Sequence, residues 1–391
     1  MGTGAYQVLL LGSIDDGRCD QLKGELQKRI TELGLPSDAV RLITSGEAHT
    51  RDIRSPLMGV FFGAPAHVGN TPLIDELLQN SVVIAPLASS LTQVKAEIPP
   101  QLYHVNVLAS DSGDGIGRVA TLVLETFRLL RRERRIFISY RRNDSQPFAE
   151  KLYDALDARG FDVFIDVRSV PPAVDFQSEL WHRMSDSDVV VLIDTPGFRE
   201  SRWTTEELAK ANATNIQILH LLWPGQKEDA ESSFSYFMEL SRRDFRWFLP
   251  RRGQSVFGST LVRICDEVER LRARAIAARY RYLVDNFCDA ARDLGLSPAV
   301  QVERWISLEN SSKSRRLAVV PAVGVPTSDR LNEIFDAVTE PQTDNRDIWI
   351  VYDNRGILNT WLDHLDWLDS HLPLRTVRMV KAPDLLRELT S

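Results

Sequence analysis

Polar and aromatic residues capable of chemistry follow two predicted strands in the middle of the chain. Tyr140, Arg141 and Arg142 come directly after a short apolar run, and Asp166 ends the next one. In an open α/β sheet, ligands bind beyond the carboxyl ends of the strands. These positions put an aromatic ring, two guanidinium groups and a carboxylate on one rim, where the guanidinium groups suit phosphate oxygens.

A second group of candidate residues lies on a predicted helix. Trp203 and Glu207 are four residues apart in the stretch WTTEEL, so they share one helix face. A carboxylate on such a face can stabilise a developing cation by electrostatics and hydrogen bonding, and an indole ring beside it can exclude water. Glu206, three residues after Trp203, competes with Glu207 for this role. The alternative is that Trp203 belongs to the core and both glutamates are solvated.

The elements that position the first group form a β-α-β unit. Ile136–Ile138 is an apolar run bounded by polar residues, which is typical of a buried parallel strand. Apolar residues recur at three- and four-residue spacing between Phe148 and Leu156 and give one helix face. The next strand, Phe161–Ile165, follows a glycine that ends the helix. Arg141–Ser145 is predicted to be a loop.

The combined motifs resemble a TIR domain. FISYRRN is followed by GFDVFID, then by SDVVVLI and SRWTTEEL, in the order that TIR domains show. The resemblance covers residues 134–225. It is particularly close to TIR domains that cleave NAD+, including the animal axon-degeneration enzyme and many bacterial defence proteins. It implies a flavodoxin-like α/β fold with a parallel sheet, and it makes Glu207 the catalytic residue.

The resemblance also assigns NAD+ as the substrate, and the chemistry of that substrate suggests roles for the other candidates. Trp203 bounds the pocket, while Arg141 and Arg142 neutralise the pyrophosphate. Tyr140 stacks on a ring, and Asp166 orients an arginine or binds a ribose hydroxyl. No metal and no separate cofactor are expected. Nicotinamide is already a good leaving group, so the reaction needs no strong general acid.

The segment after Asp166 is predicted to be a loop, because Pro171 and Pro172 forbid a regular helix there. In the family this loop contacts the neighbouring subunit and covers the substrate. Phe176 falls where family members often place an aromatic residue near the nicotinamide, or it is a core residue of the following helix. Ala173 stands where many members carry glycine, which reduces backbone freedom.

Three functions are compatible with these patterns. The first is an NAD+ nucleosidase that releases nicotinamide and ADP-ribose or a cyclic isomer, activated by self-assembly in bacterial antiphage defence. Hydrolysis and cyclisation both stay open. The second is a non-catalytic TIR scaffold that recruits other TIR proteins. The third makes the TIR unit a sensor of a cyclic nucleotide signal, with the outer domains as effectors.

The length of 391 residues predicts two or three domains, at about 100–200 residues each. The predicted fold class is α/β, with the TIR domain between two further small α/β domains. We place an N-terminal domain of unknown role at 1–132 and the TIR domain at 133–278, with its closing helix at about 257–278. A C-terminal domain at 279–391 is a candidate sensor or assembly domain for an unknown trigger.

The flanking domains show their own strand and helix patterns. The N-terminal strands are expected at 6–11, 39–44, 59–62, 81–85 and 103–109, with helices at 21–33 and 117–130. The C-terminal strands are expected at 317–320, 348–352 and 377–380, with a helix at 328–338 and an aromatic-rich helix around Trp361. Asp353–Gly356 at a strand end is a plain turn or a ligand loop.

Three stretches are harder to interpret. The basic stretch Arg128–Arg135 is expected at a helix C-terminus, where cations complement the dipole, or it binds phosphate. Residues 226–252 lack a clean period and suggest an insertion. Five arginines in the second half of the closing helix are expected on a solvated face. They are Arg270, Arg272, Arg274, Arg279 and Arg281.

Composition excludes several classes of protein. The net charge of −7 argues against a general nucleic-acid binder. The three cysteines, Cys19, Cys265 and Cys288, form no CxxC pair, which fits a reducing compartment without structural zinc. The sequence shows no signal peptide, and its apolar runs stay below the roughly 18 residues of a membrane span. We therefore expect a cytoplasmic protein that does not bind membranes.

Overall fold

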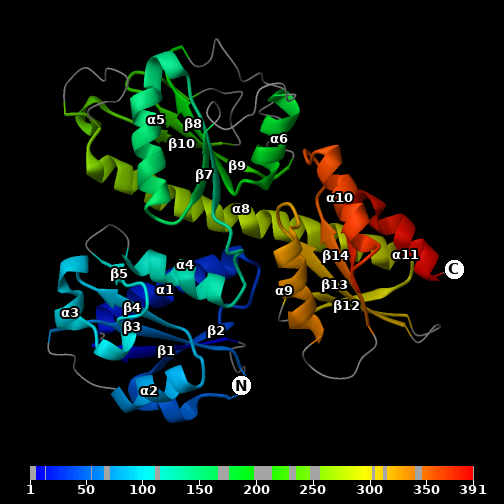
Figure 1. Ribbon diagram of the computed structural model, residues 1–391, viewed down its shortest axis with the longest axis horizontal. Coiled ribbons are helices and arrows are strands. Elements are labelled where there is room, and N and C mark those ends of the chain that lie inside the picture. The colour runs from blue at the N-terminus through cyan, green and yellow to red at the C-terminus, as the bar shows by residue number, and fades with distance from the viewer. Residues whose placement is uncertain are drawn as a thin grey trace. The chain divides into compact units, whose positions relative to one another are not determined.

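The computed structural model describes residues 6–13, 15–53, 55–65, 71–110, 115–165, 176–197, 214–228, 235–246, 256–301, 304–310, 315–339 and 346–390. The chain forms two compact units (Figure 1). Unit 1 comprises Met1–Arg132 with Val262–Arg274, and unit 2 comprises Glu133–Leu261 with Ala275–Ser391. No helix among the described residues is long and apolar enough to cross a membrane.

Unit 1 is built on a parallel sheet of five strands in the order β2-β1-β3-β4-β5. The strands are β1 (Tyr6–Gly12), β2 (Val40–Thr44), β3 (Leu57–Phe62), β4 (Ile84–Ala88) and β5 (Leu108–Ala109). The helices are α1 (Asp16–Glu32), α2 (Thr71–Gln79), α3 (Val94–Glu97) and α4 (Gly115–Thr126). One face is covered by α1 and α4, which contact each other, and the other by α2 (Figure 1).

The predicted alternation of strands and helices is confirmed in unit 1, but several boundaries were wrong and helices α2 and α3 were not predicted. The first helix starts at Asp16, five residues earlier than expected. The fourth strand starts three residues later than predicted, at Ile84, and the fifth holds only Leu108 and Ala109. The last helix ends at Thr126, and Arg128 adopts a positive φ of 57°. The basic stretch 128–135 therefore follows the helix instead of ending it.

The first sheet of unit 2 is also parallel, in the order β10-β9-β8-β6-β7. Its strands are β6 (Arg135–Ser139), β7 (Asp162–Ile165), β8 (Val189–Asp194), β9 (Gln217–Leu222) and β10 (Tyr236–Glu239). Helix α5 (Arg142–Asp157) covers one face and α6 (Phe176–Asp186) the other (Figure 1). The apolar runs place the residues of β6, β8 and β9 in the core, where nearly all of them are buried.

Two features of this sheet were predicted wrongly. Residues 226–252 were expected to be an insertion, but Tyr236–Glu239 pairs with β9 as the fifth parallel strand. Arg142 was expected in a loop, but α5 already includes it and has a kink at Ser145 (φ −142°, ψ 16°). Read from its β7 edge, the sheet has the same relative strand order as the sheet of unit 1, which is the order of flavodoxin-like folds.

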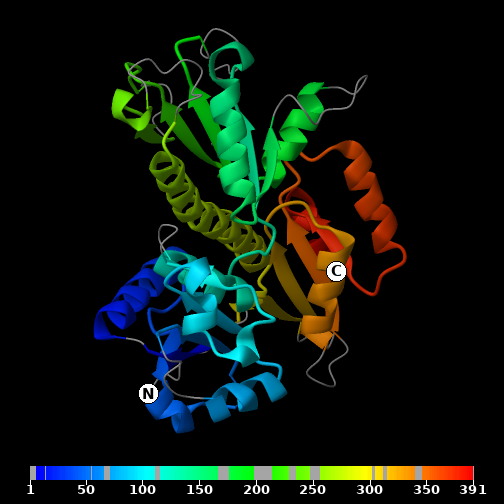
Figure 2. The ribbon, with the colours of Figure 1, turned by 60° about the vertical axis from the view of Figure 1, so that its left-hand side comes forward.

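The second sheet of unit 2 has the order β11-β12-β13-β14-β15, in which β11 and β12 run antiparallel and β13–β15 run parallel. The strands are β11 (Ser297–Val300), β12 (Ile306–Asn310), β13 (Arg315–Ala322), β14 (Arg346–Tyr352) and β15 (Arg375–Arg378). Helices α9 (Ser328–Thr339) and α10 (Asn359–Asp369) cover one face. The other is covered by α11 (Ala382–Thr390) and the end of α8 (Figure 2).

Helix α8 (Gly258–Asp293) is continuous over 36 residues, so the predicted helix is confirmed but longer than expected. The expected solvated face is wrong for two of its arginines, because Arg272 and Arg279 are buried. In unit 1, Arg272 donates to Glu125 (Nη1–Oε1 2.5 Å) and to the carbonyl oxygen of Arg131. A buried guanidinium needs such partners, since removing a charge from water is costly.

This ion pair gives a stability prediction for unit 1. Arg272→Leu should lower the local free energy of unfolding by about 3–5 kcal/mol, because it leaves the Glu125 carboxylate without its guanidinium. Hydrogen exchange of α4 amides at increasing urea concentration measures this. The double variant Arg272→Leu/Glu125→Leu should recover most of the loss. If the double variant is as unstable as the single one, the ion pair does not explain the burial of Arg272.

Candidate functional site

The candidate site lies where the strand order of the parallel sheet reverses, between β6 and β8. The chain leaves β6 towards β7 on one side, and β8 pairs with β6 on the other. The loops at the carboxyl ends of β6 and β8 therefore lie at the switch point where open α/β sheets bind ligands, and we call this place the crevice. Residues 140–144 follow β6, and residues 195–197 follow β8.

Arg141 joins the two loops at this crevice. Its Nη1 donates to the carbonyl oxygen of Gly197 (2.9 Å) and lies 3.6 Å from the Asp144 carboxylate. The side chain of Arg141 is about one-third exposed, at 34%. Both contacts involve Nη1 alone. A guanidinium carries five N–H donors, so the group retains donors for an anionic ligand.

Gly197 and Thr195 hold this arrangement from the β8 side. An ideal Cβ at Gly197 would lie 1.7 Å from Nη1 of Arg141, so only glycine leaves room for the guanidinium. The hydroxyl of Thr195 donates to Asp144 (3.0 Å), and the same carboxylate lies beside Arg141. Asp144 thus receives a hydroxyl from one loop and a cation from the other.

Behind this surface lies a buried polar pair on β8 and β9. The Nδ1 atom of His220 lies 4.0 Å from the carboxylate of Asp194, and both side chains are almost completely buried. The imidazole also lies against the ring of Phe237 on β10, with ring centroids 4.9 Å apart. Next to this pair, the backbone N–H of Trp223 donates to the carbonyl oxygen of Asp194 (3.0 Å).

Comparison with known proteins identifies the domain that carries this site. Residues 136–249 match the family described as "TIR domain". The chain carries a TIR domain. The predicted resemblance to a TIR domain is thereby confirmed, and the match extends beyond residue 225 to include β10 of the TIR sheet.

Whole-chain comparisons add no argument about function. The chain is similar to a two-component system response regulator/GGDEF domain protein, at 13% identity and a TM-score of 0.28, over 68% of this chain and 99% of that one. It is also similar to a mitochondrial ornithine carbamoyltransferase from Coccidioides immitis, at 14% identity and a TM-score of 0.17, over 72% and 86%. No curated protein matches the chain.

The predicted site residues of the TIR domain fall into two groups. Arg141 lies at the crevice, Arg142 is exposed on the first turn of α5, and Tyr140 is buried at 3% exposure. Their predicted roles toward a substrate stay predictions. The others lie outside the described residues: Asp166, Trp203, Glu206 and Glu207 entirely, and Phe176 in its side chain, although α6 begins there.

Sequence reasoning missed three residues that build the TIR crevice. Asp144, Thr195 and Gly197 hold Arg141, yet only Arg141 was singled out. The rule that selected Arg141, a polar residue just after an apolar strand, also selects Thr195 after β8. The same rule does not select Gly197, which has no polar side chain. No local signal shows that its carbonyl oxygen meets a guanidinium 56 positions earlier.

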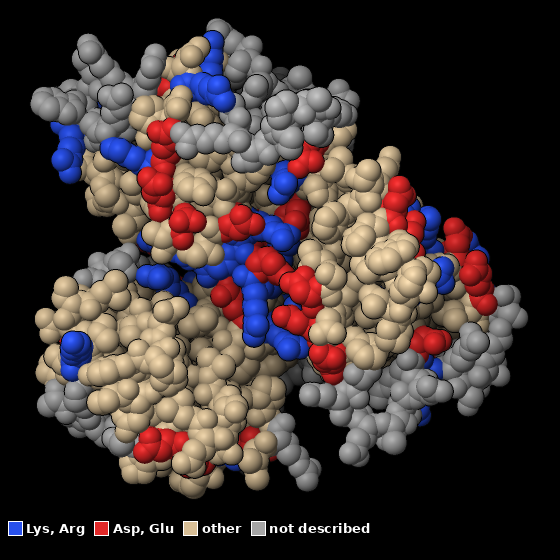
Figure 3. Space-filling model, viewed as in Figure 1, with Lys and Arg blue, Asp and Glu red and all other residues tan. Residues whose placement is uncertain are grey.

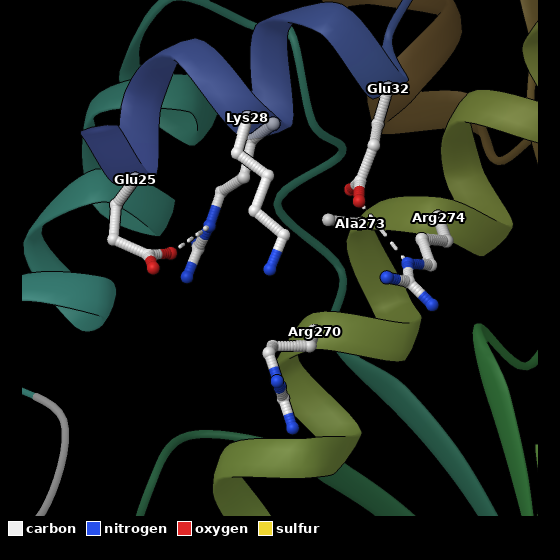
Figure 4. A pocket seen from close by; sticks show the side chains of 7 residues that line it. Glu25, Lys28, Glu32, Arg270, Ala273 and Arg274 are labelled. Atoms are coloured by element: carbon white, nitrogen blue, oxygen red, sulfur yellow. Dashed lines mark hydrogen bonds and ion pairs between the residues drawn. The ribbon is translucent and has the colours of Figure 1, made fainter. Parts of the chain in front are cut away.

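A hollow in unit 1 is a separate feature and shares no residue with the TIR crevice. It lies between α1 and α8 and is lined by Glu25, Lys28, Arg29, Glu32, Arg270, Ala273 and Arg274 (Figure 4). Arg29 pairs with Glu25 (3.6 Å), and Arg274 pairs with Glu32 (3.2 Å). These ion pairs explain the charged lining, so we assign no ligand to it. On the face drawn in Figure 3, basic and acidic side chains likewise adjoin one another.

The role of Gly197 can be tested without knowing the ligand. Gly197→Ala should displace the Arg141 guanidinium, because the added methyl group would overlap with Nη1. The Arg141 Nε–H signal in side-chain NMR spectra should shift and exchange faster with solvent.

Thr195→Val should lower the free energy of unfolding by about 1 kcal/mol, through loss of the bond to Asp144.

A matched control uses Gly258, where an added Cβ meets no atom within 4 Å. Gly258→Ala should leave the Arg141 signal unchanged. An unchanged Arg141 signal in Gly197→Ala would contradict the described arrangement of the crevice.

Proposed function

We propose that the TIR domain is an NAD+ nucleosidase that cleaves the bond between nicotinamide and ribose. The products are nicotinamide and ADP-ribose or a cyclic ADP-ribose isomer. The observation that supports this most is the family match over 136–249, because it spans both the FISYRRN stretch and the WTTEEL stretch. These stretches resemble the TIR domains that cleave NAD+.

The reaction requires the protein to stabilise charge and to position the substrate. Nicotinamide leaves as a neutral base, and the ribose carbon develops oxocarbenium character. Glu207 would stabilise that cation and bind the ribose hydroxyls. Trp203, one helical turn earlier, would exclude water from the leaving-group side. Water or an adenine nitrogen then captures the ribosyl cation, which decides between hydrolysis and cyclisation.

The described half of the crevice supports binding of the pyrophosphate. Arg141 lies at the strand-order reversal, one-third exposed, with N–H donors beyond those used by Gly197 and Asp144. Arg142 is exposed one residue later, at the start of α5. Two guanidinium groups at the amino end of a helix are suited to a doubly charged ligand, and the dipole of the helix adds to the attraction.

The wider proposal follows the same resemblance. Activity would need self-association of TIR domains, and the flanking domains would bind an unknown trigger. The setting would be a cytoplasmic, bacterial antiphage response. NAD+ is a substrate in this proposal, so the protein would need no resident cofactor.

The alternative is a non-catalytic TIR scaffold that recruits other TIR proteins. One observation favours it. The crevice residues already have structural partners, since Arg141 joins two loops and Tyr140 is buried. A scaffold needs this fold and its surface, but has no need for Glu207.

The first prediction tests catalysis. Glu207→Ala should reduce nicotinamide release from NAD+ by at least about 100-fold, because it removes the charge that stabilises the ribosyl cation. Purified protein at high concentration, with a crowding agent, is incubated with NAD+, and the products are separated by chromatography with mass detection. Glu206→Ala is the matched control and should retain most of the activity. Equal turnover in wild type and Glu207→Ala would refute the site.

The second prediction tests assembly. Substitutions within Pro171–Asp175, such as Pro172→Ala with Asp175→Ala, should lower both self-association and turnover, because the loop is proposed to complete a neighbouring site. Light scattering and NAD+ cleavage are measured on the same samples over a concentration series. A loop variant that stays monomeric yet turns over NAD+ normally would rule out the need for assembly.

A further inference from the structure

Helix α6 of the TIR domain is held at its C-terminal end by the C-terminal sheet domain of the same unit. Asp186, the last residue of α6, forms an ion pair with Arg135 at the start of β6. Its other oxygen accepts a hydrogen bond from the backbone N–H of Val325 (3.0 Å). Val325 lies in the loop between β13 and α9, so one carboxylate connects both sheets of unit 2.

A second contact uses His182, one turn earlier on α6. The Nδ1 atom of its imidazole accepts a hydrogen bond from the backbone N–H of Leu358 (3.4 Å), in the loop between β14 and α10. The imidazole also lies against the ring of Trp361 on α10, with ring centroids 5.9 Å apart. Because Nδ1 accepts here, this arrangement requires an imidazole with no proton on that nitrogen.

Gly356 and Trp361 keep these loops close to α6. An ideal Cβ at Gly356 would lie 3.0 Å from Cβ of Ser185, so the loop approaches the helix closely. The indole N–H of Trp361 donates to the carbonyl oxygen of Pro326 (3.3 Å), which ties the loop after β13 to α10. From α8, buried Arg279 donates to the carbonyl oxygens of Ser185 (2.6 Å) and Ser187 (3.0 Å).

These loops follow the carboxyl ends of β13 and β14, the edge at which an open α/β sheet presents its binding surface. In this chain that edge binds the end of α6. Helix α6 begins at Phe176, directly after residues 166–175. The contacts that hold the C-terminal end of α6 therefore limit how far this helix can move, and its first residue follows residues 166–175.

We propose that the C-terminal domain is a built-in restraint on the TIR domain, which grips α6 through Val325 and Leu358 and loosens when His182 becomes protonated. The contact is a conformational restraint with a proton-sensitive component. It stands whether or not the TIR domain cleaves NAD+.

The direction of the pH effect follows from burial. Burial is the largest influence on His182 and lowers its pKa below the ordinary 6.5, although Asp186 and Glu179 act in the opposite direction. Arg183 and Arg135, the other charged groups near the imidazole, lower the pKa further. The neutral form is thus favoured in the fold. The stability from this contact is complete above pH 6.5, the unfolded value, and is lost as pH falls through the lower folded value.

The test measures hydrogen exchange of the α6 amides in the full chain at about pH 7.5 and about pH 5.5, corrected for intrinsic exchange. In the wild type, the corrected exchange rate at the lower pH should be roughly three- to tenfold higher than the corrected rate at the higher pH. Leu358→Pro removes the donor, and the backbone at Leu358 (φ −60°) already suits proline. This variant should exchange fast at both pH values.

Leu358→Ala is the matched control, since it truncates the same side chain but keeps the N–H. It should retain the pH dependence of the wild type. His182→Asn offers a second approach, because its amide oxygen lies near the position of Nδ1 and does not titrate. Exchange in this variant should be slow at both pH values. Amides of β13 and β14 report whether each variant has folded.

Two results would overturn the proposal. One is an α6 exchange rate that Leu358→Pro leaves unchanged at the higher pH. The other is a pH dependence that persists undiminished in both Leu358→Pro and His182→Asn.

Discussion

The carboxylate of Asp186 binds two donors that come from distant parts of the sequence, Arg135 and the N–H of Val325. A carboxylate that is only 15% exposed must be fully paired, because water no longer solvates it. The pairing fixes the start of β6, the end of α6 and the loop after β13 at one point. Arg279 then places a buried cation against the carbonyl oxygens at the end of the same helix, where the helix dipole favours it. The arrangement of unit 2 depends on this cluster.

Both ends of the strands in the TIR sheet therefore carry contacts that matter for the domain. Its carboxyl edge carries Arg141 and the crevice at the strand-order reversal, and its amino edge carries Asp186 and the contact with the C-terminal domain. Helix α6 connects the two edges, because a parallel crossover must return from the end of β7 to the start of β8. At 11 residues the helix spans about 16 Å, so a shift at one end reaches the other through a rigid element.

The elements that the sequence predicted best are the strands marked by apolar runs. The buried strands β1, β6, β8 and β14 were found because short continuous apolar stretches between polar residues are typical of strands inside a parallel sheet. Three strands were missed. β10 and β11 are edge strands that expose much of their length, so neither shows an apolar run. β12 lies inside its sheet, but buried Ile306 and Leu308 alternate with more exposed residues instead of forming a continuous run.

Contacts between distant residues could not be predicted in the same way. From the sequence, Arg272 belongs to a run of arginines expected to be exposed. It is buried because it pairs with Glu125, 147 positions earlier. The candidate site was predicted in part: the strand-end rule selected Arg141, but not the carbonyl oxygen of Gly197 that holds it. The same limit hid the contact between Leu358 and His182, in which the donor is a backbone group with no sequence signature.

Because α6 precedes Leu358 in the chain, the contact between them forms late in protein synthesis. Ribosomes add roughly 5–20 residues per second, and domains fold as they emerge. The TIR helix that ends at Asp186 is made well before Leu358. The whole TIR domain, which ends at residue 249, precedes Leu358 by 109 positions (358 − 249), or roughly 5–22 seconds of synthesis. During that interval each new TIR domain exists without its restraint, so nascent chains on one polysome would be the least restrained TIR domains in the cell.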